Sequence, residues 1–255
     1  MRVSVSSVLK SHGQGESESG IIGCVKKCGI IGGLGPASTV DYYNGIIAGC
    51  RNQSDDNHYP EIIINSIDMT KVLSMVANNE WDGLTEILVQ SVREVANAGA
   101  DFAAIASNTP HIVFGRVAER SALPLISIVD ETCKYAQGMK CGKVLVIGTL
   151  FTMRSGLYTD AFTKYGMTAQ VPTEQEQKDI FSLFYPNLEN GIVVPDDKEK
   201  MLILLRKIIT RERYDALVLG CTELPLMIKS EDIDIRLINT TQIHIDSIIT
   251  AIRKG

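Results

Sequence analysis

Several residue patterns are missing from this sequence, and each absence excludes a class of protein. No apolar run approaches the ~18 consecutive residues that a membrane-spanning helix needs. The 25 basic residues are outnumbered by 30 acidic ones, which gives a net charge of −5, and no cluster of Lys and Arg offsets it. We therefore expect neither a membrane nor a nucleic acid as a partner.

Cysteine and histidine are present but lack the spacings of a metal site. No two cysteines form a C-x-x-C pair, and the four histidines are scattered, so the sequence predicts no bound metal. A chain of 255 residues can bury a sufficient core without disulfides. We expect a cytoplasmic protein with reduced thiols at its six cysteines, which are Cys24, Cys28, Cys50, Cys133, Cys141 and Cys221.

The composition of residues 1–27 differs from that of the rest of the chain. The stretch "SVSSVLKSHGQGESESG" is rich in Ser and Gly and has little hydrophobic periodicity, which predicts a flexible extension. It lacks the long apolar core of a secretory signal, and Glu16 and Glu18 have the wrong sign for an organelle transit peptide. We expect the folded part to begin at Cys28.

Short apolar runs alternate with helical patterns over the remainder of the chain. The runs at 29–33, 61–67, 101–107 and 123–129 are bounded by Gly, Pro and Asn, which is typical of buried parallel strands. Over 79–99, apolar residues recur at the spacing of one helix face. This alternation predicts an α/β fold with parallel sheets.

The same order of motifs occurs twice in the chain. "KVLVIGTLFTMRSGLY" repeats the order of "CGIIGGLGPASTVDYY" at an offset of 116 residues, and "YDALVLGCT" repeats "DFAAIASNT" at an offset of 114. "IRLINT" repeats "LPLISI" at an offset of 112. Three matches in order, at a nearly constant offset, predict a duplicated domain.

The repeat places two polar residues at equivalent positions. We predict a first domain over 28–130, a second over 131–240, and a C-terminal helix over 241–255 that packs back on the first domain. Ligands of open α/β sheets bind beyond the carboxyl ends of the strands. Ser107 and Cys221 follow equivalent strands, so two halves related by a pseudo-two-fold axis would bring both side chains to one cleft from opposite sides.

Two proton-transfer groups on opposite sides of one carbon suit inversion of a stereocentre. One group removes a proton, and the other delivers a proton to the far side. We expect the pKa of the Cys221 thiol to fall towards neutral, because a helix is predicted to start at "TELPLMI". Backbone N–H groups after Ser107 and Cys221 would bind a substrate carboxylate. Glu223 would accept from the substrate ammonium or orient the thiol.

The glycine-rich turn "GGLGPAS" allows another interpretation, which is nucleotide binding. Gly33 and Gly35 supply a G-x-G pattern, but Ser38 stands where the third glycine of that motif belongs. The simpler interpretation is a strand end followed by a helix whose first turn contains Pro36. The backbone of this turn can still line the cleft.

Four motifs together resemble those of the aspartate/glutamate racemase family, the cofactor-independent amino acid racemases. They are "GIIGGLGP", "ASNTPH", "GTLFTMRSGLY" and "LGCTELP", in this order from about Cys28 to the C-terminus. The resemblance implies two Rossmann-like domains with the active site between them, assembled as a homodimer. It also implies a reaction with an amino acid and no cofactor, in which a cysteine from each half flanks the α-carbon.

The resemblance also assigns roles to individual residues. Cys221 matches the second family cysteine, and Ser107 occupies the place of the first. His111 matches a histidine that is common just after the first motif. Lys178 lies where the family often has a lysine for the distal carboxylate of the substrate. The implied substrate-binding positions are Leu34, Asn108, Thr109, Thr149, Lys178, Thr222 and Glu223.

Two departures from the family pattern shape the functional prediction. A serine hydroxyl is a far weaker acid than a thiol, so Ser107 is a poor anionic base and can only relay or donate a proton. By resemblance Cys221 serves the L-substrate, and we predict L-to-D as the productive direction. Aspartate-specific members have an arginine near "INSIDM", where this chain offers only Lys71. We therefore predict action on aspartate, glutamate or both.

Other functions fit the same scaffold. Relatives with a single cysteine at the second position include decarboxylases of substituted malonates, and cis–trans isomerases of maleate belong to the wider group. A non-catalytic amino acid sensor that has lost its first base is a further alternative. The polar donors of "ASNTPH" and "CTELP" favour an amino acid over an arylmalonate.

Overall fold

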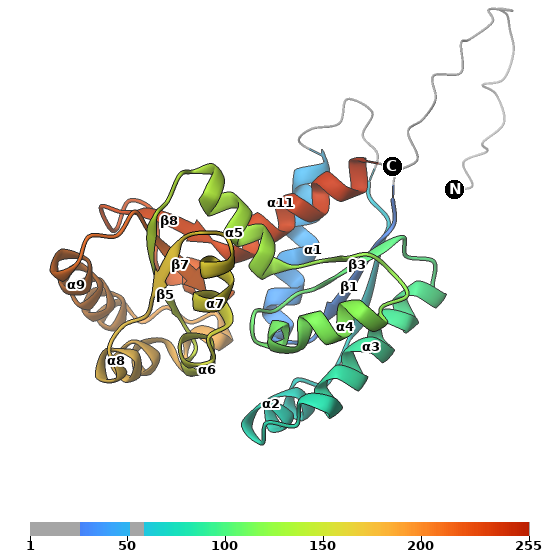
Figure 1. Cartoon of the computed structure of the whole chain (residues 1–255), viewed down its shortest axis with the longest axis horizontal. Coiled ribbons are helices and arrows are strands. Elements are labelled where there is room, and N and C mark those ends of the chain that lie inside the picture. Colours follow the sequence, from blue (N-terminus) through green and yellow to red (C-terminus); the bar gives the residue numbers. More distant parts are fainter. Residues whose placement is uncertain (1–25, 52–58, 255) are drawn as a thin grey trace, which may run out of the picture.

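The computed structural model describes residues 26–51 and 59–254 (Figure 1). The predicted extension, apart from Lys26 and Lys27, lies outside the described residues, and so does Cys24. The first half of the chain contains these elements: β1 (Cys28–Gly32), α1 (Pro36–Arg51), β2 (Ile62–Ser66), α2 (Met69–Ala77), α3 (Trp81–Asn97), β3 (Phe102–Ile105), the 3-10 helix η1 (Thr109–Val113), α4 (Phe114–Arg120), β4 (Leu125–Ile126) and α5 (Ile128–Gly138).

The second half repeats the alternation of strands and helices. Its elements are β5 (Lys143–Gly148), α6 (Leu150–Arg154), α7 (Leu157–Lys164), β6 (Thr168–Gln170), α8 (Glu174–Phe184), the 3-10 helix η2 (Leu188–Asn190), α9 (Pro195–Arg211), β7 (Ala216–Gly220), α10 (Leu224–Met227), β8 (Arg236–Asn239) and α11 (Thr240–Arg253).

Each half is built on a four-stranded parallel sheet, and the two sheets share one topology. The strand order is β2-β1-β3-β4 in the first sheet and β6-β5-β7-β8 in the second. Every strand of one sheet therefore has a counterpart at the same place in the other, and all pairings are parallel. The predicted fold class, two similar α/β units with parallel sheets, is confirmed.

Alternating side chains of the central strands build a core on both faces of each sheet. In the second half, Leu145 and Ile147 pack with helices α8 and α9. Val144 and Val146 point to the other face and pack with α7 and with α5, which covers the second sheet although it precedes β5 in the chain. The same alternation occurs in β1 and β3 of the first half. Burial on both faces explains why these strands read as continuous apolar runs.

One predicted strand is much shorter in the structure than in the sequence interpretation. The run at 123–129 forms only the two-residue strand β4. Ser127 caps helix α5 by accepting a hydrogen bond from the N–H of Asp130, so Ile128 and Val129 belong to that helix and not to the strand. The predicted helix over 79–99 is observed as α3.

Helix α11 connects the two halves. Its first turn contributes Ile243 to a core of the second half, and the remainder packs on the first half (Figure 1). Ile245 and Ile249 lie against Gly45 and Gly49 of α1, where an added Cβ would approach within 2.9 and 2.3 Å of them. These two glycines let α1 and α11 pack closely, so most of the C-terminal helix lies against the first half.

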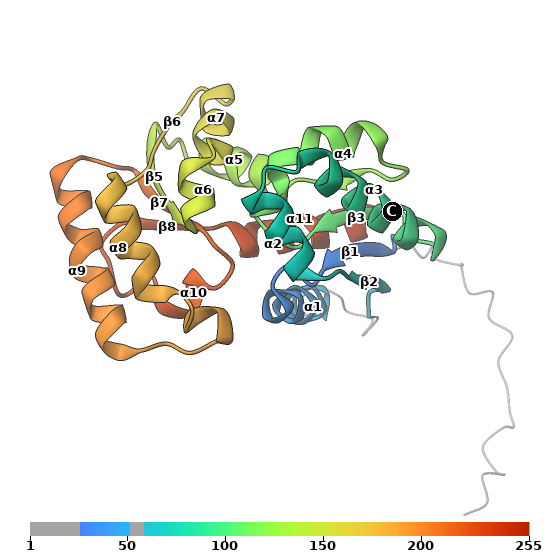
Figure 2. The same cartoon turned by 90° about the horizontal axis from the view of Figure 1, so that it is seen from below.

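Figure 2 shows the two halves side by side, with α2 of the first half near the junction. Over residues 26–51 and 59–254, no helix combines the length and the apolar character that crossing a membrane requires.

Candidate active site

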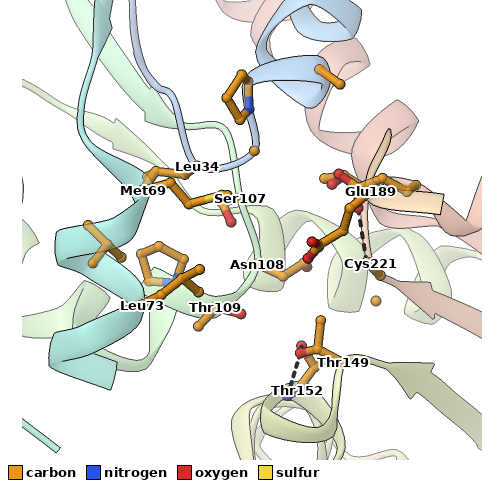
Figure 3. A pocket seen from close by; sticks show the side chains of 18 of the residues that line it. Leu34, Met69, Leu73, Ser107, Asn108, Thr109, Thr149, Thr152, Glu189 and Cys221 are labelled. Carbon is orange, nitrogen blue, oxygen red and sulfur yellow. Dashed lines mark hydrogen bonds between the residues drawn. The ribbon is translucent and has the colours of Figure 1, made fainter. Parts of the chain in front are cut away.

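A cavity of about 520 Å³ lies between the halves, beyond the carboxyl ends of β1, β3, β5 and β7. Its size falls within the ~300–1,000 Å³ that is typical of small-molecule sites. Side chains from both halves point into it (Figure 3). Eight of the nine site residues predicted from the sequence line this cavity: Leu34, Ser107, Asn108, Thr109, Thr149, Cys221, Thr222 and Glu223.

Cys221 follows β7 and is 7% exposed. Its thiol donates a hydrogen bond to Oε2 of Glu223 over 3.0 Å (Figure 3). Burial and the negative charge of Glu223 raise the pKa of the thiol well above its ordinary value. The expected decrease of this pKa is therefore wrong, because helix α10 has only four residues and begins three positions after Cys221.

Ser107 follows β3 at the equivalent place and is 8% exposed. Its hydroxyl forms no hydrogen bond with any other described residue. Its backbone carbonyl accepts from Nδ1 of His111 over 2.8 Å, and Nε2 of the same ring accepts from the N–H of Ile128 over 3.2 Å. Both ring nitrogens are thus committed to backbone groups, and burial lowers the pKa of His111 to about 3. A neutral histidine holds the Ser107 turn in place.

Asn108 is held by groups from the second half. The hydroxyl of Tyr158 donates to Oδ1 of Asn108 over 2.5 Å, and Nδ2 of Asn108 donates to Oγ1 of Thr240 over 3.4 Å. The Thr240 hydroxyl in turn donates to the carbonyl of Leu219 over 2.9 Å. This chain of hydrogen bonds fixes the amide of Asn108 at the junction of the halves.

Loops after β1 and β5 complete the polar part of the wall. Thr149 caps helix α6 by accepting from the N–H of Thr152 over 3.2 Å. The turn after β1 requires a positive φ of 82° at Gly33, which favours glycine there and positions Leu34 at the cavity. A Cβ on Gly35 would lie 3.3 Å from Oε1 of Glu223, so this carboxylate reaches across to the first half.

The structure does not bring Lys178 to the cavity. Lys178 lies on α8, its side chain is 52% exposed, and it forms an ion pair with Glu174 one turn earlier over 2.9 Å. Lys71, on α2, is also not among the lining residues.

Several residues that line the cavity were not among the predicted site residues, and five of these contribute side chains from α2, α6 and η2. Met69, Val72 and Leu73 belong to α2, Thr152 to α6, and Glu189 to η2. Met69 follows the carboxyl end of β2 closely, so the rule on strand ends could have indicated the start of α2. No local signal marks Glu189, which enters the cavity from a loop between α8 and α9.

The described residues contain no group of three or more His, Cys, Asp or Glu that could hold a metal ion. The chemically reactive groups of the cavity are the buried thiol of Cys221, its carboxylate partner Glu223 and the hydroxyl of Ser107 at the matching strand end. Fold and site together define a class: two-domain α/β proteins with one ligand cavity between duplicated halves.

Comparison with known proteins gives the family. The model of the Asp/Glu/hydantoin racemase family matches residues 31–248, and the chain belongs to this family. A structure of an aspartate racemase homologue from Pyrococcus horikoshii OT3 is 32% identical, with a TM-score of 0.80 over 89% of this chain and 99% of that one. A putative Asp/Glu racemase from Yersinia pestis is 25% identical, with a TM-score of 0.83 over 89% and 99%.

A further relative is the "broad specificity amino-acid racemase RacX" of Bacillus subtilis (strain 168). It is 23% identical over 218 residues, which cover 84% of this chain and 92% of that protein. The predicted membership of a racemase family is confirmed.

Proposed function

We propose that this protein racemises an α-amino acid without a cofactor, by moving the α-proton between the two sides of the cavity. The observation that carries the proposal is the placement of Cys221 and Ser107 at matching strand ends around one cavity. Family membership supports the reaction class. Asn108, Thr109, Thr149 and Thr222 would hold the substrate carboxylate with hydroxyl, amide and backbone N–H donors.

On the Cys221 side, the reaction begins with ionisation of the thiol. The thiol proton passes along the 3.0 Å hydrogen bond to Glu223, and the thiolate then removes the α-proton of the L-substrate. The electron pair of the broken C–H bond stays on the substrate, delocalised into its carboxylate. Glu223 is thereby the group that orients the thiol and receives its proton.

On the Ser107 side of the cavity, the α-carbon receives a proton on the face opposite to Cys221. The hydroxyl donates its proton to the carbanion and takes one from a water molecule in the cavity, and the hydroxide left behind recovers the proton that Cys221 removed. Glu223 then returns the original thiol proton to Cys221, which restores the starting state. Since Ser107 has no basic partner among the described residues, removal of the α-proton from the D-substrate is slow. The productive direction is therefore L to D. Equal stability of the enantiomers requires equal kcat/KM, so the asymmetry lies in kcat and KM separately.

The identity of the substrate side chain, the oligomeric state and the location of the protein stay predictions. The names of the relatives, an aspartate racemase homologue and a broad-specificity amino acid racemase, support an amino acid as substrate and leave its side chain open. A homodimer, a cytoplasmic location and the absence of a cofactor remain expectations from the sequence.

Exchange of the α-proton in heavy water tests the proposal. The protein is incubated with the L- and D-forms of aspartate, glutamate, methionine and lysine, and loss of the α-proton signal is followed by NMR together with the optical purity. Exchange with inversion supports a racemase. Carbon dioxide release from a substituted malonate would indicate a decarboxylase instead, and ligand-induced stabilisation without either reaction would indicate a sensor.

A further inference from the structure

We propose, resting on the function above, that the substrate carries a cationic group on an alkyl side chain, and that Glu189 is the residue that recognises this cation. The inference replaces the expected dicarboxylic substrate with an amino acid of the lysine or ornithine type. It depends on the charges and the shape of the cavity wall.

The charges of the cavity wall are negative only. Among the described residues that line it, Glu189 and Glu223 are ionisable carboxylates, and none is Lys, Arg or His. Lys178, which the resemblance assigned to the distal carboxylate, pairs with Glu174 instead. Lys71, which stands near the place of an arginine in aspartate-specific members, is not in the wall. A second substrate carboxylate would thus enter this cavity without a cationic partner, at a high desolvation cost.

The two glutamates have different surroundings. Glu223 is engaged by the Cys221 thiol and lies against the loop at Gly35. Glu189, on η2, has no hydrogen-bond or ion-pair partner among the described residues, and its side chain points into the cavity on the same side as Cys221 (Figure 3). An unpartnered carboxylate facing a ligand cavity is a binding group for a cation.

The negative charges near the Cys221 thiol also favour a substrate with a cationic side chain. Burial and the charge of Glu223 raise the pKa of Glu189, and both glutamates raise the pKa of Cys221. A side-chain cation next to Glu189 offsets one of these charges and makes the thiolate easier to form. A side-chain carboxylate would add a further negative charge and oppose ionisation of the thiol.

The opposite wall supplies an apolar surface for an alkyl stem. Leu34, Met69 and Leu73 lie together across the cavity from Glu189 and Cys221 (Figure 3). Lysine-like side chains bury their methylene groups on apolar surface while the charged end keeps a polar partner. The short stem of aspartate has little to place on this wall.

Substrate competition and one substitution test the proposal. Exchange of the α-proton is measured for L-lysine, L-norleucine and L-glutamate with the natural protein and with Glu189→Gln. We expect L-lysine to be used with a higher kcat/KM than L-glutamate. Glu189→Gln should lower kcat/KM for L-lysine by about 10-fold to 100-fold, the loss typical of a hydrogen bond to a charged group, and leave L-norleucine nearly unchanged.

Glu199→Gln is the matched control, because Glu199 is an exposed carboxylate of α9 that does not line the cavity. It should leave all three substrates unchanged. Faster use of L-glutamate than of L-lysine would overturn the proposal, and so would equal losses for L-lysine and L-norleucine in Glu189→Gln.

A binding measurement separates this inference from the proposed reaction. The shift of the melting temperature is recorded with L-lysine and with L-glutamate. A shift with L-lysine that Glu189→Gln removes supports the recognition of a cation, even if no amino acid is racemised. A larger shift with L-glutamate overturns it, whatever the catalytic result.

Discussion

The two halves of the molecule share a topology but carry different residues after the equivalent strands β3 and β7. The first half places Ser107 there, and its hydroxyl has no hydrogen-bond partner among the described residues. The second half places Cys221 there, with Glu223 as a hydrogen-bond acceptor at 3.0 Å. Both copies have the same backbone topology, whereas the thiol–carboxylate pair occurs in only one of these two strand ends.

The difference extends to the residues just beyond these positions. At the repeat offset, Glu223 corresponds to Thr109, and Pro225 corresponds to His111. The first half uses its histidine, buried and neutral, to hold backbone groups of its turn. The second half has a carboxylate that contacts the thiol of Cys221. In this duplicated fold, one copy therefore presents neutral polar groups after β3, while the other carries the ionisable pair after β7.

The largest expected effect comes from removing the thiol. Cys221→Ala should lower the rate of α-proton exchange by ~10²–10⁴-fold, the usual contribution of a positioned proton-transfer group. Cys141→Ala serves as control, because that cysteine is buried in a core of the second half away from the cavity. Retention of more than a tenth of the exchange rate in Cys221→Ala would contradict the assigned role.

The buried histidines predict a loss of stability in mild acid. Burial lowers the pKa of His111 to about 3 and that of His244 to about 4, from 6.5 in the unfolded chain. Between these values the unfolded state binds protons that the folded state does not. The free energy of unfolding should therefore fall as the pH drops below 6.5, by about 2 kcal/mol per histidine at pH 5.

Urea unfolding at pH 7 and pH 5 measures this loss. Glu176, whose pKa is lowered from 4.5 to about 2, acts in a lower pH window, because its contribution is lost as the pH falls from about 4.5 towards 2. Equal free energies of unfolding at pH 7 and pH 5 would show that the histidines titrate normally in the folded state.

Glu223→Gln tests the carboxylate that distinguishes the second half. We expect kcat for the L-substrate to fall by about 10-fold to 100-fold, because the charged acceptor of the thiol proton is lost. Since the charge of Glu223 raises the pKa of Cys221, the limb of the pH–rate profile that reports the thiol should move to lower pH. An unchanged profile would mean that the carboxylate is not coupled to the thiol.

Ser107→Cys would make the two halves more alike and is expected to have the smallest effect. A thiol at this position should raise kcat from the D-substrate by roughly 10-fold, because a thiolate is a better base than a hydroxyl. Ser107→Ala is the matched control and should abolish inversion while leaving exchange with retention from the L-side. If Ser107→Cys leaves turnover of the D-substrate unchanged, the one-sided mechanism is wrong.

Local patterns in the sequence predicted the central strands and the residues that follow their carboxyl ends. Apolar runs indicated the central strands, and the rule that ligands bind at strand ends brought Ser107, Asn108, Cys221 and Glu223 to one cavity. These predictions succeeded because parallel strands of a buried sheet fix where their carboxyl ends lie.

The failures concern properties that depend on three-dimensional surroundings. The pKa of Cys221 rises because the site is buried and a carboxylate lies beside the thiol, neither of which a predicted helix start reveals. Lys178 was predicted to reach the substrate, but its ammonium group pairs with Glu174, four residues earlier on the same helix. Glu189 reaches the cavity only through the path of the chain between α8 and α9, and no residue pattern encodes that path.

The hydrogen bonds at Asn108 have a mechanical consequence. Asn108 belongs to the first half, but Tyr158 and Thr240 hold it from the second half and from the start of α11. Any hinge-like separation of the halves must break those bonds or move Asn108 relative to the rest of the cavity wall. The position of Asn108 is therefore mechanically coupled to the distance between the two halves.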